Sequence, residues 1–285
     1  FASYPAARLS AAWEAAIYPA HGWGGKEGQV TDRLFRKKYE FARDEGRTVL
    51  HDAMTAIAGR IAVHPAKGMP IVVFNSLSWP VTAPVVVPLP RYRSGHSIVI
   101  QSQRYKIIDA DGDKCPFQRL PRGASGTGSL PEYEFMADDV PALGYKTFYM
   151  VEDEGRGWEP RTGRAPEVIE NGWYRLRLAP GGLAGLYDKE LDREVLDTRK
   201  FLGFEVFTMR SVGNGAGEFG RVQQPTMEGF DSLGRHKPAW RLVAGETGPV
   251  KTVLALEQPM PDCTVRQKLI VYNTIKRIDC MVELI

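Results

Sequence analysis

The 285-residue chain has few cysteines and no long apolar run, and these shortages exclude several classes of protein. Its three cysteines, Cys115, Cys263 and Cys280, are odd in number and far apart, which argues against a disulfide framework and a Cys-x-x-Cys metal site. No stretch approaches the ~20 uninterrupted apolar residues that a membrane-spanning helix needs. The formal net charge is only +3 and no Lys/Arg run concentrates it. Neither nucleic acid nor a membrane is therefore indicated as a partner.

What is present is the composition of an ordinary globular protein with more than one domain, 43% hydrophobic and 25% charged. Sparse cysteine favours a reducing compartment, and we expect a cytoplasmic location. The first residue is Phe1 rather than methionine, and the last ten, KRIDCMVELI, have the pattern of a strand with no turn after it. We therefore expect a longer parent protein, in which case the lack of a signal peptide says nothing about secretion.

Common catalytic motifs are missing or incomplete. The chain has no G-x-S-x-G elbow and no H-E-x-x-H zinc motif. DADGD, residues 109–113, resembles a calcium loop, but its glycine comes fourth rather than sixth and Leu120 stands where a bidentate Glu is required. We expect a hairpin turn there. GAGEFG, residues 215–220, matches G-x-G-x-x-G, yet Pro225 follows instead of a helix, so a dinucleotide site is not indicated.

The N-terminal residues 1–64 have a helical pattern. Apolar residues from Leu9 to Ala20 recur on one helix face, and a second apolar stripe runs from Phe35 to Ile61. A helix of 30 residues would be about 45 Å long. Two helices alone cannot bury so long a stripe, so we expect further helices outside this chain to pack against it.

From residue 65 onward the pattern changes to short β-branched runs broken by Pro, Gly and Asp, which indicates antiparallel sheets. We expect a small β-sandwich over residues 65–153, a polar linker over 154–166, and the first part of a larger sandwich over 167–285. The predicted fold class is therefore α+β and multidomain, with a helical domain followed by β-sandwiches.

The helix-to-loop junction around PAHGWGG, residues 19–25, holds the best candidate for a functional residue. His21 lies where a helix end can point into a cleft, and the flanking glycines allow close backbone approach. Trp23 offers an aromatic face of the kind that packs on sugars. The remaining histidines are expected to be structural: His51 beside Asp52 on a helix, and the isolated His64, His96 and His236.

The order of several segments resembles the α-mannosidases of glycoside hydrolase family 38. The motifs are VFNSLSW (73–79), the series from Asn171 to Leu196 with its Y-D-K-E and R-E-V-L elements, and KRID (276–279). In that family a three-helix bundle joins an N-terminal catalytic domain to C-terminal β-sandwiches, the larger of them mutarotase-like. The resemblance covers essentially the whole chain and implies that residues 1–64 contribute a helical hairpin to such a bundle.

The resemblance implies a retaining, zinc-dependent enzyme that hydrolyses α-mannosidic bonds in mannose-containing oligosaccharides. His21 matches the zinc-binding histidine at the bundle's helix-to-loop junction, and Trp23 becomes a candidate sugar contact. Gly22 stands where the family usually has an aspartate. The nucleophile and the other zinc ligands are expected upstream of Phe1, so we expect this portion to be inactive alone and not to retain zinc; self-association is left open.

The alternative is a non-catalytic carbohydrate-binding or scaffolding module, because mutarotase-like sandwiches often bind sugars and the glycine-rich loop 213–220 could line such a site. A lyase or mutarotase on the same fold is a third possibility, but it would need a cluster of histidines and carboxylates that the β region does not display.

Overall fold

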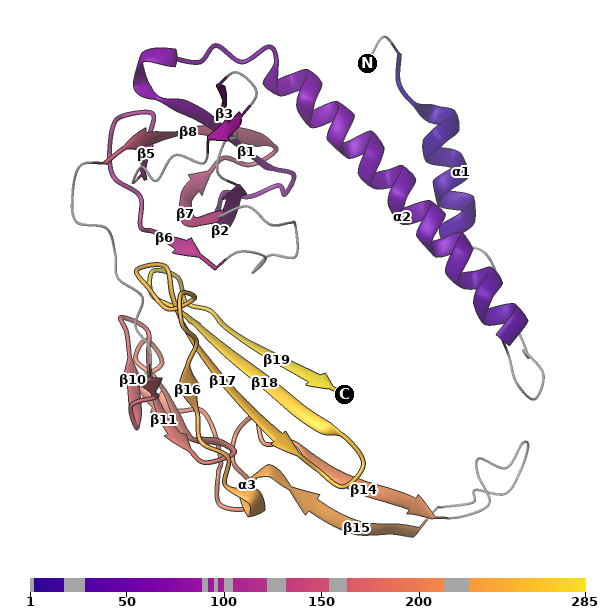
Figure 1. Cartoon of the computed structure of the whole chain (residues 1–285), viewed down its shortest axis with the longest axis vertical. Coiled ribbons are helices and arrows are strands. Elements are labelled where there is room, and N and C mark those ends of the chain that lie inside the picture. Colours follow the sequence, from indigo (N-terminus) through magenta and orange to yellow (C-terminus); the bar gives the residue numbers. More distant parts are fainter. Residues whose placement is uncertain are drawn as a thin grey trace.

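A computed structural model describes residues 3–17, 29–88, 92–94, 97–99, 105–121, 132–153, 163–212 and 226–285 (Figure 1). The helices are α1 (Ala6–Ala16), α2 (Gln29–Ala58), the 3-10 helix η1 (Pro65–Lys67) and the short α3 (Leu233–His236). The strands are β1 (Met69–Asn75), β2 (Val81–Pro88), β3 (Tyr92–Ser94), β4 (Ser97–Val99), β5 (Tyr105–Asp109), β6 (Phe117–Leu120), β7 (Glu132–Val140), β8 (Gly144–Glu152), β9 (Gly163–Arg164), β10 (Val168–Glu170), β11 (Tyr174–Ala179), β12 (Gly182–Asp188), β13 (Arg193–Glu194), β14 (Phe207–Val212), β15 (Thr226–Ser232), β16 (Arg241–Leu242), β17 (Lys251–Pro259), β18 (Thr264–Tyr272) and β19 (Ile278–Leu284).

Helices α1 and α2 lie side by side and form an arm beside the β-sheets (Figure 1). Ala12 and Ala15 of α1 are buried, as is Val49 of α2, because small residues on α1 let the two backbones approach closely. Arg8 of α1 forms an ion pair with Glu45 of α2. The predicted helical pair is therefore present in this region.

Two three-stranded sheets, in the orders β1-β8-β5 and β2-β7-β6, form a first sandwich. Phe135 of β7 and Phe148 of β8 are fully buried between the sheets, with ring centroids 5.0 Å apart. Pro84 lies within β2, which is an edge strand, and the edge is where a residue without an N–H is tolerated. Alternating inward and outward residues thus produce the predicted small sandwich.

A second sandwich packs the sheet β10-β11-β12-β13 against the five-stranded sheet β19-β18-β17-β16-β9. Leu176 of β11 and Leu254 and Leu269 of β17 and β18 are fully buried between these sheets. The strand pairings in the described parts of the chain are antiparallel throughout. The predicted α+β class with antiparallel sandwiches is confirmed.

Three local features differ from the sequence-based expectation or refine it. Gly163 and Arg164, within the expected linker 154–166, form β9 and pair with β16 at the edge of the second sandwich. The segment 233–236, expected as part of the β region, is the helical turn α3. β14 and β15 form a separate two-stranded ribbon that extends from the second sandwich (Figure 1).

The turn between β11 and β12 shows why glycine is needed there. Gly181 has φ +86°, and a Cβ on it would lie 2.7 Å from the backbone of Leu233. Its N–H donates to the Pro238 carbonyl at 2.9 Å. A left-handed backbone in close contact with α3 therefore allows no side chain, and the turn anchors α3 to the sheet.

Among the described helices, none combines the length and the apolar character that crossing a bilayer requires.

Candidate functional site

His21 and Trp23, the residues that the sequence singles out, fall between α1 and α2 in a segment outside the described residues. Gly22 lies in the same segment. The glycine-rich loop 213–220, which follows β14, is also outside the described residues. Within the described ranges, no group of three or more His, Cys, Asp or Glu side chains is arranged to hold a metal ion. The assignments of His21 to zinc and of Trp23 to the sugar therefore stay predictions.

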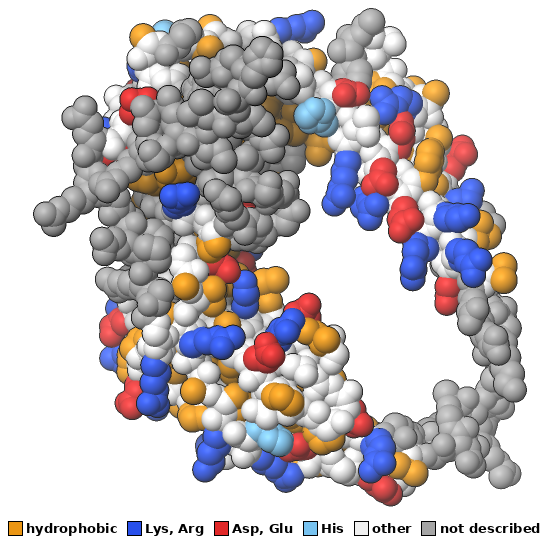
Figure 2. Space-filling view, in the orientation of Figure 1, with side chains coloured by type: hydrophobic (Ala, Val, Ile, Leu, Met, Phe, Trp, Pro, Cys, Tyr) orange, Lys and Arg blue, Asp and Glu red, His pale blue; other side chains and the backbone are white. Residues whose placement is uncertain are grey.

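The helical arm that carries this segment exposes much of its apolar stripe. Leu50 is 59% exposed and Ile57 47% exposed on α2, although Val49 is covered by α1. On α1, Trp13 also presents most of its indole to solvent. A space-filling view shows an opening between the arm and the sandwiches (Figure 2). Large exposed apolar side chains in a row indicate a surface for another protein segment.

The histidines and carboxylates expected to be structural have contacts that fit this role. Asp52, next to His51, lies 3.5 Å from Arg8 Nη1, so it takes part in the packing of α1 on α2. His236 Nε2 lies 2.7 Å from Asp231 Oδ2 at the base of the β14–β15 ribbon. The hydrogen bond from His236 holds the pKa of Asp231 below its usual range. His96 lies outside the described residues.

DADGD forms the expected turn. Asp109 Oδ1 accepts hydrogen bonds from the backbone N–H groups of Asp111, Gly112 and Asp113 at 2.9–3.0 Å. Gly112 has φ +98°, which a glycine adopts at no steric cost. This carboxylate oxygen therefore closes a turn, as in an Asx-turn.

Asn75 explains the VFNSLSW motif in structural terms. The side chain is buried at the end of β1. Its Nδ2 donates to the carbonyls of Trp79, Val140 and Pro141 at 2.8–3.1 Å, and its Oδ1 accepts the Leu77 N–H at 2.9 Å. One amide thus joins the turn after β1 to the end of β7, which requires both a donor and an acceptor at this position.

The two C-terminal motifs meet in an ion-pair network between the sheets of the second sandwich. Lys276 Nζ lies 3.0 Å from Asp188 Oδ2 and also bonds Glu190. Asn171 Nδ2 donates to the Tyr272 carbonyl at 2.8 Å. Motif residues about 85 to 100 positions apart in sequence are therefore neighbours, and their contacts join β12 and the segment before β11 to the β18–β19 turn.

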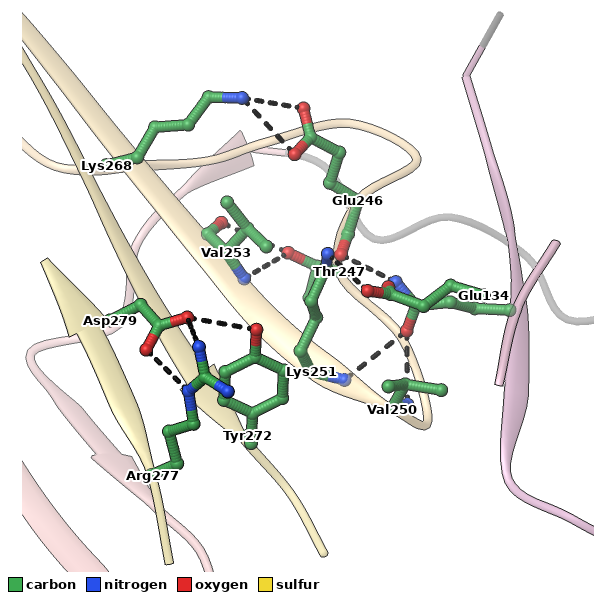
Figure 3. Close-up of polar contacts among 11 residues, drawn as sticks. Glu134, Glu246, Thr247, Val250, Lys251, Val253, Lys268, Tyr272, Arg277 and Asp279 are labelled. Carbon is green, nitrogen blue, oxygen red and sulfur yellow. Dashed lines mark hydrogen bonds and ion pairs between the residues drawn. The ribbon is translucent and has the colours of Figure 1, made fainter. Parts of the chain in front are cut away.

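A second polar cluster lies where the two sandwiches meet (Figure 3). Lys251 Nζ of β17 donates to Glu134 Oε1 of β7 at 2.8 Å, and these side chains are only 11% and 4% exposed. Gln118 of β6 is fully buried; its Nε2 donates to the Glu246 carbonyl at 2.8 Å, and its Oε1 accepts the Val250 N–H at 3.1 Å. These bonds connect strands of one sandwich to a turn and strand of the other.

The electrostatics of this junction follow from burial. Burial raises the pKa of Glu134, while the charge of Lys251 acts in the opposite direction. Glu134 Oε2 is buried and makes no hydrogen bond. Burial, followed by the nearby Asp279 carboxylate, raises the pKa of Tyr272 to about 12, and the Tyr272 hydroxyl donates to Asp279 Oδ2 at 3.1 Å. Both pKa values are raised chiefly because these titratable groups are buried in a poorly hydrated interface.

A pocket of about 400 Å³ lies beside this junction, lined by the first sandwich and by Thr274 of the second. Its lining is Thr82, Asp109, Asp113, Lys114, Cys115, Pro116, Met136, Asp138, Lys146, Phe148 and Thr274. Asp138 Oδ1 accepts the Thr82 hydroxyl at 2.6 Å, and Lys146 donates to the Asp138 carbonyl at 2.9 Å. Burial raises the pKa of Cys115 to about 11, so the thiol is protonated near neutral pH and is not an activated nucleophile.

The inter-sandwich pair of Glu134 and Lys251 was not expected from the sequence. A signal does exist in EYEFMADDV, the sequence of β7, because Glu134 and Met136 alternate with Tyr133 and Phe135. A strand with apolar residues on both faces is covered on both faces, which would bury the glutamate. Its partner is 117 residues away, and no local pattern identifies it.

Comparison with known proteins shows which solved structures share this fold. No protein-family model and no curated protein matches the chain. Solved structures match over 99% of the chain: a protein in the glycosyl hydrolase family 38 from Enterococcus faecalis, with a TM-score of 0.68 and 13% identity, and an alpha-mannosidase from Enterococcus faecalis V583, with a TM-score of 0.66 and 14% identity.

The chain spans only 39% and 38% of the length of those two structures. At such low sequence identity the likeness establishes the fold and not the chemistry. The resemblance to family 38 that the motifs indicate is confirmed at this level. The helical arm and the two sandwiches together have the fold of part of these glycosyl hydrolase family 38 structures.

Proposed function

We propose that this chain is part of a zinc-dependent retaining α-mannosidase that hydrolyses α-mannosidic bonds in mannose-containing oligosaccharides. The observation that carries the proposal is the fold match to family 38 structures over 99% of the chain. The order of the VFNSLSW, Y-D-K-E and KRID motifs supports it independently. The exposed apolar stripe of the helical arm also supports it, because such a surface suits the remainder of a larger enzyme.

In this proposal His21 is a zinc ligand and Trp23 contacts the sugar. The described residues contain no metal-binding group of their own, so they do not by themselves fit a zinc site. A zinc ion needs three or four ligands, and those beyond His21 would have to come from outside this chain. The sandwiches act as the scaffold that holds the helical arm, the chain alone is inactive, and a cytoplasmic location rests on the cysteine count only.

The test is a pair of histidine variants in the longer parent protein. His21→Ala is expected to lower both the zinc content, measured by mass spectrometry, and the hydrolysis of a chromogenic α-mannoside. His51→Ala, an exposed histidine on α2, is the matched control and should change neither. If His21→Ala retains full zinc and turnover, the assignment is wrong.

One observation favours the alternative of a carbohydrate-binding module. Phe201, Phe207 and Phe230 form an aromatic cluster at the base of the β14–β15 ribbon, with ring centroids 5.7–6.3 Å apart. Phe201 and Phe207 are substantially exposed, and exposed aromatic rings are common sugar-stacking surfaces. Arg235 lies over the Phe230 ring at 4.9 Å and could add a hydrogen-bond donor.

Calorimetric titration of the chain with mannose and mannobiose separates the two readings. The module predicts saturable binding that Phe207→Ala abolishes and His21→Ala leaves unchanged. The enzyme-part proposal predicts no measurable binding to the isolated chain, because the sugar site is completed by residues outside it.

A further inference from the structure

The two sandwiches meet through a small mixed interface. β7 presents Met136 to the second sandwich, and Met136 packs with buried Val250, Val253, Ile270 and Tyr272. This apolar cluster has only five buried members. Packing of that kind is non-directional, and domains joined by small interfaces move relative to one another by default.

Directional contacts are concentrated beside this cluster. Gln118 binds the turn before β17 at both ends of its amide, through the Glu246 carbonyl and the Val250 N–H. The turn is itself closed: Thr247 Oγ1 donates to the Val253 carbonyl at 3.1 Å and accepts the Val253 N–H at 3.0 Å. The hydrogen bonds of the fully buried Gln118 amide to this turn therefore restrict how the two sandwiches can be oriented, without fixing the angle by themselves.

The Glu134–Lys251 pair adds a charge contact next to the same turn (Figure 3). Removing both charges from water costs about as much as their attraction returns, so apolar residues of similar volume at both positions are expected to give equal stability. The orphan Oε2 of Glu134 increases this cost. The pair is therefore expected to contribute little net stability. Because an ion pair with a hydrogen bond is favourable only over a narrow range of distances and angles, it is suited to fixing orientation.

We propose that Gln118, Glu134 and Lys251 form an orientation lock that holds the two sandwiches at one angle, while the Met136 cluster supplies most of the adhesion. The lock determines how the second sandwich is presented to the rest of the protein. It is a property of the described residues and does not depend on the proposed enzymatic function.

The test measures orientation and stability separately in the full chain. Spin labels are attached to the exposed Cys280 of the second sandwich and to a Glu152→Cys substitution on β8 of the first, with Cys263→Ser removing the third accessible thiol; Cys115 is buried. Pulsed electron-spin measurements then report the distribution of inter-label distances, and urea unfolding reports the midpoint.

The double variant Glu134→Leu/Lys251→Met is expected to keep the wild-type midpoint while its distance distribution becomes about twofold wider, because freed domains move. Glu257→Leu/Arg266→Met is the matched control; it removes an exposed pair 2.8 Å apart within the second sandwich and should leave the width unchanged. Met136→Ala should show the opposite pattern, a lower midpoint with a narrow distribution.

A narrow distribution in the Glu134→Leu/Lys251→Met variant would overturn the proposal, since orientation would then be set without the pair. Failure of that variant to fold, or a large fall in its midpoint, would also overturn it, because the pair would then act mainly in stability. Gln118→Leu, which removes the turn contacts and retains both charges, should widen the distribution as well.

Discussion

Replacing Lys251 alone should destabilise the protein strongly, and the loss should depend on pH. At an effective dielectric constant of about 20, unit charges 2.8 Å apart attract by about 6 kcal/mol. Much of this is offset by desolvation in the folded wild type, but Lys251→Met leaves the buried Glu134 carboxylate without its cation. Breaking a buried pair from one side typically costs about 3–5 kcal/mol.

The pH dependence follows from the direction of the Glu134 pKa. Burial already raises this pKa in the folded wild type above the unfolded value, so the folded state binds more protons and stability falls as pH rises through the folded pKa. Lys251 lowers this pKa, so its removal raises it further. The deficit of Lys251→Met relative to wild type should therefore be about 3–5 kcal/mol at pH 8 and smaller at pH 5, because a raised Glu134 pKa favours the neutral carboxyl as pH falls.

The assay is urea unfolding of both proteins at pH 5 and pH 8. The matched control is Lys268→Met, which breaks a pair with Glu246 at 3.0 Å in which the lysine is 43% exposed, and about 0–1 kcal/mol is expected there. A loss in Lys251→Met that is equal at both pH values, or no larger than that of the control, would refute the reasoning about a buried charge.

Three further changes test other parts of the fold. Asn75→Ala should cost about 1–3 kcal/mol in urea unfolding, because three buried or partly buried carbonyls lose their donor; Ser76→Ala, one residue on, is the control. Gly181→Ala should cost more than about 1 kcal/mol in thermal unfolding, since φ is +86° and the new Cβ meets backbone; an unchanged midpoint would contradict the geometry. Tyr272, whose pKa is raised to about 12, contributes stability that is present below pH 10 and lost as pH rises through 12; Tyr272→Phe should remove this part of the alkaline loss in circular dichroism titrations.

Local pattern predicted the elements well where one physical rule dominated. The 3.6-residue apolar period of residues 35–61 predicted α2, and period-two alternation predicted β18, where Val265, Leu269 and Val271 are fully buried. Turn chemistry predicted the hairpin at 109–113. The helical turn α3 was missed because a four-residue element has no period to detect and is held by its contact with Gly181.

For the candidate site, too, some features could be predicted from the sequence and others could not. The motif order indicated the fold of family 38 structures, and His21 remains the sequence-based candidate for a zinc ligand. The pairing of Lys276 with Asp188, however, joins residues 88 positions apart, and the Glu134–Lys251 pair joins residues 117 apart. The type of each residue is known from the sequence, but the residue that it contacts is known only from the folded structure.

The sequence by itself determined the class of the protein: helices first, antiparallel sandwiches after, and a helix-to-loop histidine among glycines. These follow from periodicity, turn residues and composition, which act over a few residues at a time. Only the tertiary structure decided how the sandwiches join and that a glutamate on β7 is buried against a lysine on β17, because burial and charge pairing depend on which distant surfaces the chain brings together.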